Sequence, residues 1–311
     1  MALKLQFLPL FIALGCQNSA TDLGEKASTT EQSPAQCLTE GTQHELWERL
    51  GSPIIFDEGT PVAPSLLAVD EALWLYYSLR DGLHDTVYLL QSSDGQEWSE
   101  PILVTGFDSE TEIKHFNATH SADGFQALLG GGSITSLRSD NGVQWTIEGQ
   151  QLVSASDFDQ WGQLYPTPDP TSERMWYSGF SGTTYAIGLA ERSGDTWSNQ
   201  GPVLQHDAST SYEDTAVAQS SVLSTGDGLR MWYGGYDTSQ SDPGPWRILS
   251  AVSNDGIHWD KQGLALDLTE SGEEAYSVRE PSLAQWNGQL WMAYVSMGDD
   301  SVYRLRLARC N

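Results

Sequence analysis

Short runs of alternating apolar and polar residues, separated by Gly, Asp, Asn and Ser, recur along most of the chain. One unit opens with an apolar and aromatic run at residues 73–78, continues through 87–93, and ends in an Asp-Gly-x-x-Trp turn at Trp98. Alternation with a period of two is typical of β-strands that bury one face, and the intervening turn residues mark antiparallel connections. Each unit predicts four short strands, which is enough for one antiparallel sheet.

The unit repeats at a nearly constant interval. Its turn tryptophans stand at positions 47, 98, 145, 197 and 259, so successive turns lie 51, 47, 52 and 62 residues apart. Intervals of this size, each holding four strands, are typical of β-propeller blades. The sequence therefore predicts an all-β fold, a five-bladed β-propeller of four-stranded antiparallel blades. We expect the turn tryptophans to be packing anchors, because large aromatic side chains dominate buried contacts.

The two ends of the chain predict how the ring closes. The last unit supplies only three strands, at residues 278–286, 289–297 and 302–310. Residues 47–56 repeat the turn tryptophan and the apolar run that follows it in the other units. We expect this segment to supply the missing outer strand, because a closed ring removes the exposed sheet edges.

The first 15 residues have the plan of an export signal. Lys4 precedes an apolar run at residues 5–14, which is too short to span a bilayer. Residues 13–16, Ala-Leu-Gly-Cys, resemble the lipobox of bacterial lipoproteins. The resemblance implies that Cys16 is acylated and becomes the mature N-terminus, and Gln17 after it implies the outer membrane. The alternative is an ordinary secretory cleavage just downstream.

Residues 16–43 are rich in Ser, Thr, Gln and Glu and show no hydrophobic period, so we expect a flexible acylated tether before a propeller at 44–311. On this interpretation the protein is exported and anchored at the outer membrane or cell surface, and it meets the membrane through the lipid on Cys16. The two remaining cysteines, Cys37 and Cys310, flank the seam of the ring. In an oxidising compartment they predict one disulfide.

Composition and charge narrow the function. The 12 Trp, 12 Tyr and 30 Gly agree with an aromatic-rich, turn-rich β protein. Asp and Glu total 42 against 15 Lys and Arg, a formal net charge of -27, so the surface repels polyanions and a nucleic-acid partner is excluded. The six histidines are scattered without a metal-type pair on one element. We expect a monomer that holds no metal and no other cofactor.

The repeat also resembles a known family. Its Met-Trp-Tyr strands and Asp-Gly-x-x-Trp turns are similar to those of five-bladed propellers of the arabinanase, levansucrase and invertase type, over roughly residues 44–310. The turn with Asp140, Gly142 and Trp145 is in addition similar to the Asp box of sialidases. The first resemblance implies a glycoside hydrolase whose ligand, a glycan, binds at the face where the innermost strands begin.

Side chains suited to sugar chemistry precede or open the predicted inner strands. Hydrolysis of a glycosidic bond needs one carboxylic acid that protonates the leaving oxygen and a second carboxylate that activates water or attacks the sugar. Glu280, in a Glu-Pro step similar to the general-acid strand of the resembled family, is the expected acid. The candidate bases are Asp57, Asp159 and Asp214. The candidate substrate-binding residues are Arg279, Tyr276, His115, Tyr165 and Trp161.

Two observations keep a second function open. The resembled enzymes carry an Asp before a Pro in the first inner strand and another Asp in the second, whereas residues 62–65 and 116–119 hold no acid here. Arg279 and Glu280 form either a catalytic pair or a structural ion pair. The sequence therefore predicts either a glycoside hydrolase acting on a poly- or oligosaccharide or a non-catalytic surface lipoprotein that binds a glycan or a protein. The hydrolase requires two carboxylates that converge on one pocket.

Overall fold

A computed structural model describes residues 47–54, 56, 59–81, 84–107, 114–152, 156–169, 172–194, 196–238 and 245–310. The signal segment, Cys16, Cys37 and Asp57 lie outside these residues, so what the sequence predicts for them stays a prediction. Within the described ranges all regular structure is β-strand, and no helix there is long and apolar enough to cross a membrane.

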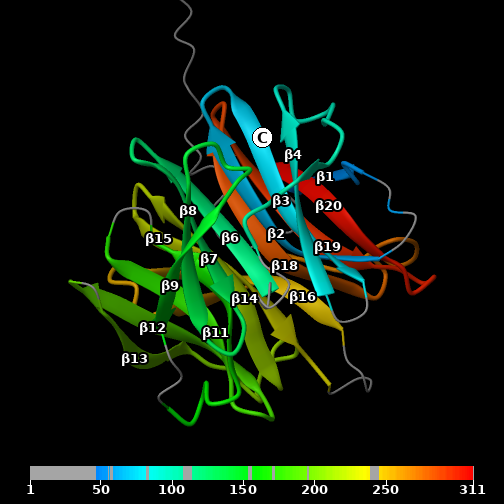
Figure 1. Ribbon diagram of the computed structural model, residues 1–311. Coiled ribbons are helices and arrows are strands. Elements are labelled where there is room, and N and C mark those ends of the chain that lie inside the picture. The colour runs from blue at the N-terminus through cyan, green and yellow to red at the C-terminus, as the bar shows by residue number, and fades with distance from the viewer. Residues whose placement is uncertain are drawn as a thin grey trace, which may run out of the picture. The chain divides into compact units, whose positions relative to one another are not determined.

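Twenty strands form five antiparallel sheets of four strands, which are the blades of the predicted five-bladed propeller (Figure 1). Blades 1 to 4 each follow the chain from the innermost to the outermost strand. Blade 1 holds β2 (Thr60–Val69), β3 (Ala72–Asp81), β4 (His84–Ser92) and β5 (Ile102–Leu103). Blade 2 holds β6 (Lys114–Ser121), β7 (Gly124–Gly130), β8 (Ile134–Ser139) and β9 (Thr146–Leu152). Blade 3 holds β10 (Gly162–Pro168), β11 (Arg174–Phe180), β12 (Tyr185–Ser193) and β13 (Thr196–Leu204). Blade 4 holds β14 (Ala216–Thr225), β15 (Gly228–Tyr236), β16 (Trp246–Ser253) and β17 (Asp260–Leu266).

Blade 5 combines the two ends of the described chain. It holds β18 (Ser277–Trp286), β19 (Gln289–Met297) and β20 (Tyr303–Cys310), and β1 (Trp47–Gly51) pairs antiparallel with β20 as the outermost strand. The predicted closure by the N-terminal segment is confirmed. The strand ends earlier than expected, because Gly51 has a left-handed φ of 91° at a register shift and Pro53 has no N–H to donate to the ladder.

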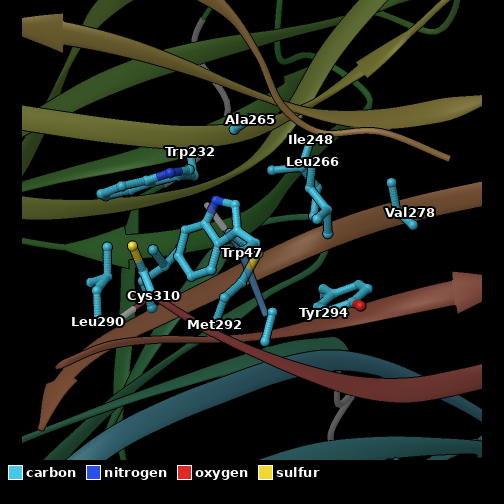
Figure 2. Close-up of a cluster of buried hydrophobic side chains, with 12 residues drawn as sticks. Trp47, Trp232, Ile248, Ala265, Leu266, Val278, Leu290, Met292, Tyr294 and Cys310 are labelled. Atoms are coloured by element: carbon cyan, nitrogen blue, oxygen red, sulfur yellow. The ribbon is translucent and has the colours of Figure 1, made fainter. Parts of the chain in front are cut away.

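Trp47 fixes this closing strand in the core. Its ring packs in a buried cluster between the strands of blades 4 and 5, near Trp232, Met292 and Cys310 (Figure 2). The backbone register places Trp47 opposite Cys310. Truncating a buried aromatic side chain typically costs about 3 to 5 kcal/mol, so Trp47 contributes substantially to keeping the ring closed.

The repeated turns are built around one side chain that precedes the glycine. In blade 2 Asn141 Oδ1 accepts hydrogen bonds from two backbone N–H groups of the turn, both at 2.9 Å. Asp94 in blade 1 and Asp255 in blade 4 accept the corresponding bonds. The capping side chain is therefore Asn141, one position after the Asp140 that the similarity to the sialidase box singles out.

Each of these turns packs against an aromatic residue of the preceding blade. Gly142 of blade 2 lies so close to blade 1 that a Cβ built on it would be 2.6 Å from the Trp74 ring. Trp176 of blade 3 donates its indole N–H to Gly256 O of blade 4 at 2.9 Å. The turn tryptophans themselves pack as predicted: Trp47 and Trp145 are buried, and Trp98, Trp197 and Trp259 are partly buried against core clusters.

Candidate functional site

Each innermost strand has a β-bulge near its start, and one non-glycine residue at each bulge has a left-handed backbone conformation. These residues, one per blade and together called the bulge ring, are Ala63, His115, Tyr165, Gln219 and Glu280, with φ angles of 50°, 51°, 49°, 64° and 58°. Such a conformation costs about 1 to 3 kcal/mol and persists where surrounding contacts hold it. A bulge also changes the direction of a side chain. The bulge ring lines a pocket of about 20 Å³, enough for about one water molecule, which opens to the solvent.

Hydroxyl side chains two residues beyond the ring positions tie neighbouring inner strands together. Four such bonds join blades 1 and 2, 5 and 1, 4 and 5, and 3 and 4. They are Ala118 N to Ser65 Oγ (3.0 Å), Leu66 N to Ser282 Oγ (2.9 Å), Leu283 N to Ser221 Oγ (3.1 Å) and Thr167 Oγ1 to Ser220 O (2.5 Å). These bonds fix the strands that carry the bulge ring, so the ring residues are pre-positioned.

Glu280 lies at the centre of the contacts within the ring, and the residue is only 3% exposed. Its Oε2 accepts a hydrogen bond from Ala63 N at 2.5 Å, and its Oε1 accepts one from the Tyr165 hydroxyl at 3.2 Å. Arg279 Nε lies 3.4 Å from the same Oε1. Burial and the negative charge of Glu280 raise the pKa of Tyr165 well above its usual value, so this phenol stays protonated and donates.

Gln219 and His115 complete the wall of the pocket. Gln219 Oε1 accepts a hydrogen bond from Glu280 N at 3.2 Å, and its Nε2 donates to the Tyr165 hydroxyl at 3.4 Å. The rings of His115 and Tyr165 pack with their centroids 3.7 Å apart. The pocket is thus lined by the amide of Gln219, the carboxylate of Glu280, the phenol of Tyr165 and the imidazole of His115. Ala63 leaves room on the side of blade 1.

Two of the predicted bases do not line this pocket. Asp159 is fully buried, and its Oδ2 accepts hydrogen bonds from the Tyr177 hydroxyl at 2.9 Å and from Asn199 Nδ2 at 3.0 Å. Asp214 Oδ1 accepts hydrogen bonds from Thr238 N at 2.9 Å and from a threonine hydroxyl beside it at 2.6 Å. Among the described residues that line the pocket, Glu280 is the one carboxylate.

The contact between Asp159 and Tyr177 belongs to a repeated structural feature. In blades 3, 4 and 5 a buried acid in the segment before the inner strand accepts a hydrogen bond from a tyrosine of the second strand. The pairs are Asp159 with Tyr177 (2.9 Å), Glu213 with Tyr233 (3.0 Å) and Glu274 with Tyr294 (2.8 Å). Since the same pair recurs in three blades, we conclude that these acids hold the segments before the inner strands in place.

Three predicted substrate-binding residues lie close to the strand ends that carry the bulge ring. Trp161 directly precedes β10 and is 70% exposed, and Tyr276 directly precedes β18 and is 38% exposed. The Trp161 ring rests on Gly182, where an added Cβ would be 2.9 Å from the indole. Arg279 adjoins Glu280 and stacks on the Tyr303 ring, with its Cζ 4.8 Å from the ring centroid.

Comparisons with known proteins identify the fold and no closer relationship. No family model matches the chain, and no curated protein matches it. The solved structure of a glycoside hydrolase has a TM-score of 0.68 at 11% identity and covers 85% of this protein and 91% of the hydrolase. The fold is shared. A structure from a study of the GH130 family of mannoside phosphorylases has a TM-score of 0.61 at 13% identity, covering 81% and 85%. An N-acetylgalactosamine deacetylase from F. plautii has a TM-score of 0.63 at 14% identity, covering 85% and 95%.

Sequence reasoning brought Glu280, His115 and Tyr165 together but missed the two other ring positions, Ala63 and Gln219. A signal for them is present in the inner strands. Three strands read as a ring residue, then Pro, then Ser or Thr: Ala63-Pro64-Ser65, Tyr165-Pro166-Thr167 and Glu280-Pro281-Ser282. Gln219-Ser220-Ser221 occupies the same place in blade 4. Aligning the blades on this tripeptide finds Ala63, Tyr165 and Glu280. It also finds Gln219 when Ser is allowed in place of Pro, but it does not find His115.

Proposed function

We propose that this propeller is carbohydrate-active and binds a glycan over the mouth of the pocket of the bulge ring. The observation that carries the proposal is that five left-handed positions, one per blade, surround one pocket and present His115, Tyr165, Gln219 and Glu280 to it. Left-handed non-glycine residues cluster at ligand sites, where the fold holds them in place. Sugar hydroxyls donate and accept hydrogen bonds, so an amide, a carboxylate and a phenol beside an aromatic face suit them.

Hydrolysis is the second candidate function, with Glu280 as the general acid. It is favoured by the burial of Glu280 at the centre of the pocket and by the likeness of the fold to glycoside hydrolases. Hydrolysis needs a second carboxylate about 5 to 9.5 Å from the first. The described lining residues supply one carboxylate, whereas Asp57 lies outside the described residues. Binding is therefore the primary proposal, and cleavage depends on an acid from a segment such as that of Asp57.

Titration calorimetry on the full-length protein in detergent tests the binding proposal. The panel contains arabinans, fructans, xylans and mannosides, together with oligosaccharides that contain galacturonate, glucuronate or sialate. We expect one class to bind, and Glu280→Ala to weaken it at least 10-fold, because a lost hydrogen bond to a charged group costs about 1.5 to 3 kcal/mol. Glu173→Gln, an exposed carboxylate on blade 3, is the matched control and should bind as wild type does. Absence of binding to every glycan, or undiminished binding by a folded Glu280→Ala variant, refutes the proposal.

Product analysis on the glycan that binds separates the two candidates. If the protein is a hydrolase, Glu280→Gln should lower turnover by roughly 10²- to 10⁴-fold with affinity retained, because an amide keeps the shape but cannot deliver the proton. Binding without any cleavage by wild type establishes the binding module.

We also propose that the propeller is exported and held at the outer membrane or cell surface by lipid on Cys16, with residues 16–43 as a tether. Support comes from the leader at residues 1–15 and its similarity to a lipobox. Lipid attachment would keep a glycan-binding domain where extracellular or periplasmic glycans are encountered.

A further inference from the structure

The guanidinium of Arg279 is a strong donor group beside Glu280 whose hydrogen-bonding capacity the described residues leave largely unused. Its buried Nε has no hydrogen-bond acceptor, and the closest oppositely charged atom is Glu280 Oε1 at 3.4 Å. Its Nη atoms donate no hydrogen bond to a described residue, although the side chain is only 20% exposed. Buried polar groups in folded proteins are almost always hydrogen-bonded, so such an arginine points to an acceptor that arrives with a ligand.

Contacts around Arg279 leave its Nη groups, unlike the buried Nε, open to an incoming acceptor. The Tyr303 ring covers one face of the guanidinium, with Cζ 4.8 Å from the ring centroid. Stacking on an aromatic face does not use the N–H groups, which lie in the plane of the guanidinium. Glu280 does not use them fully either, because its carboxylate is already held by Ala63 N and the Tyr165 hydroxyl. The positive charge of Arg279 is thus only partly compensated by described residues and can bind an anionic group of a ligand.

Arg279 lies next to a bulge-ring residue, near groups from three blades. Its charge acts on Tyr165 and Tyr185 of blade 3 and on Tyr303 of blade 5, and Arg80 of blade 1 is close enough to repel it. Arg279 thus lies beside Glu280 of the bulge ring and near charged or phenolic groups of two other blades.

Arg80 supplies a second, oriented guanidinium. Its Nε and Nη2 donate to the two oxygens of Asp85, both at 2.8 Å, which leaves Nη1 for another acceptor. Two arginines close enough to repel each other are notable in a protein with 15 Lys and Arg residues against 42 acids. A planar guanidinium binds a carboxylate through two parallel charge-assisted hydrogen bonds, which are stronger than those to the hydroxyls of a neutral sugar.

We infer that the glycan recognised here contains an acidic sugar whose carboxylate binds the N–H edge of Arg279, with Arg80 as the neighbouring cation. The inference rests on the proposed glycan function and adds the substrate class. Because the rest of the surface is strongly acidic, a polyanion is repelled, and the expected ligand carries isolated rather than dense negative charge.

Calorimetry with oligosaccharides containing galacturonate, glucuronate or sialate, each compared with its methyl ester, tests the inference in wild-type protein. We expect at least one acid form to bind 10-fold or more tighter than its ester, with the difference shrinking as salt is added. Arg279→Met should abolish the preference for the acid, and Arg279→Lys should retain only part of it. Arg192→Met, which removes an exposed arginine of blade 3, is the control and should leave the preference unchanged.

The outcomes separate this inference from the proposed function. If neutral sugars or esters bind as tightly as the acids, the glycan site stands and the acidic-sugar inference is overturned. If sulfated disaccharides bind better than every carboxylated sugar, the carboxylate assignment is likewise overturned. If no sugar of any kind binds, both proposals fall. Should Arg279→Met fail to fold, as judged by thermal unfolding, the acid and ester comparison in wild type decides alone.

Discussion

Glu280 on the last blade accepts a hydrogen bond from the backbone N–H of Ala63 on the first blade, at 2.5 Å. The residue at the centre of the candidate site therefore also joins the innermost strands of the last and first blades. Glu280→Ala should lower the free energy of unfolding by about 1 to 3 kcal/mol, because the Ala63 N–H loses its acceptor. Glu280→Gln should cost less, since its amide oxygen still accepts. Urea unfolding followed by tryptophan fluorescence measures both, and equal stability of wild type and Glu280→Ala would contradict the structural role.

The turn glycines test how the blades pack against one another. Gly142 has φ 71°, and a Cβ on it would meet Trp74 at 2.6 Å, so Gly142→Ala should destabilise the protein by about 2 to 4 kcal/mol. Gly132→Ala is the matched control, because a Cβ there has nothing within 4 Å, and its effect should stay within about 0.5 kcal/mol. Thermal unfolding of both variants gives the comparison. Similar melting temperatures for the two would show that the turn does not set the packing of blades 1 and 2.

The fold was predictable because its signals are local and repeated. The spacing of the turn tryptophans identified five blades, and the repeat around Trp47 identified the closing strand. Each signal depends on residues within one blade, where an alternating pattern and a turn determine the strands directly.

The site was predictable only in part, because its geometry depends on residues from different blades. A Glu-Pro step marked Glu280, but nothing in one strand shows that Gln219 and Tyr165 meet it across the channel. Asp159 had the expected type and place for a base, yet its carboxylate is turned into a hydrogen-bond network of blade 3. Side-chain direction at a bulge is set by backbone conformation, which residue type alone does not reveal.

Asp159 provides a test that separates a structural acid from a catalytic one. Asp159→Asn should destabilise the protein by roughly 1 to 3 kcal/mol, because a buried acceptor of the Tyr177 hydroxyl is replaced by an amide that disturbs the network. Glycan binding by the folded fraction should be unchanged. Unaltered stability together with lost turnover would instead assign Asp159 to the chemistry.

The positions of Cys37 and Cys310 on either side of the seam of the ring predict a disulfide between them. Cys310 is 2% exposed at the end of β20, opposite Trp47, where a crosslink to the segment before β1 would hold the closing strand in place. Closing so long a loop stabilises the folded state by about 4 to 5 kcal/mol at most. Peptide mapping under non-reducing conditions should find the two cysteines linked in exported protein, and Cys37→Ser should lower the melting temperature. Two free thiols in exported protein would exclude the bond.

The direction of the strands in blade 5 shows on which side of the propeller the pocket lies relative to the first described residue. Trp47, where the described residues begin, pairs with Cys310, and Cys310 also pairs with Leu290 at the start of β19. This is the end of blade 5 opposite to that of Glu280, which lies near the start of β18. The described chain thus begins on the side of the propeller far from the pocket, and a flexible tether from a lipid on Cys16 to this side should leave the pocket facing the solvent.

Lipid on Cys16 is the premise of that orientation, and both are measurable. Mass spectrometry of the mature protein should find an acylated N-terminal Cys16, and Cys16→Ser should release the protein from the membrane fraction, because the acyl chains supply the membrane affinity. Wild-type protein reconstituted in vesicles should bind its glycan as tightly as in detergent, since the pocket faces the solvent. An unmodified N-terminus downstream of Cys16 would refute the anchor, whereas acylated protein that binds glycan in detergent but not on vesicles would refute the orientation alone.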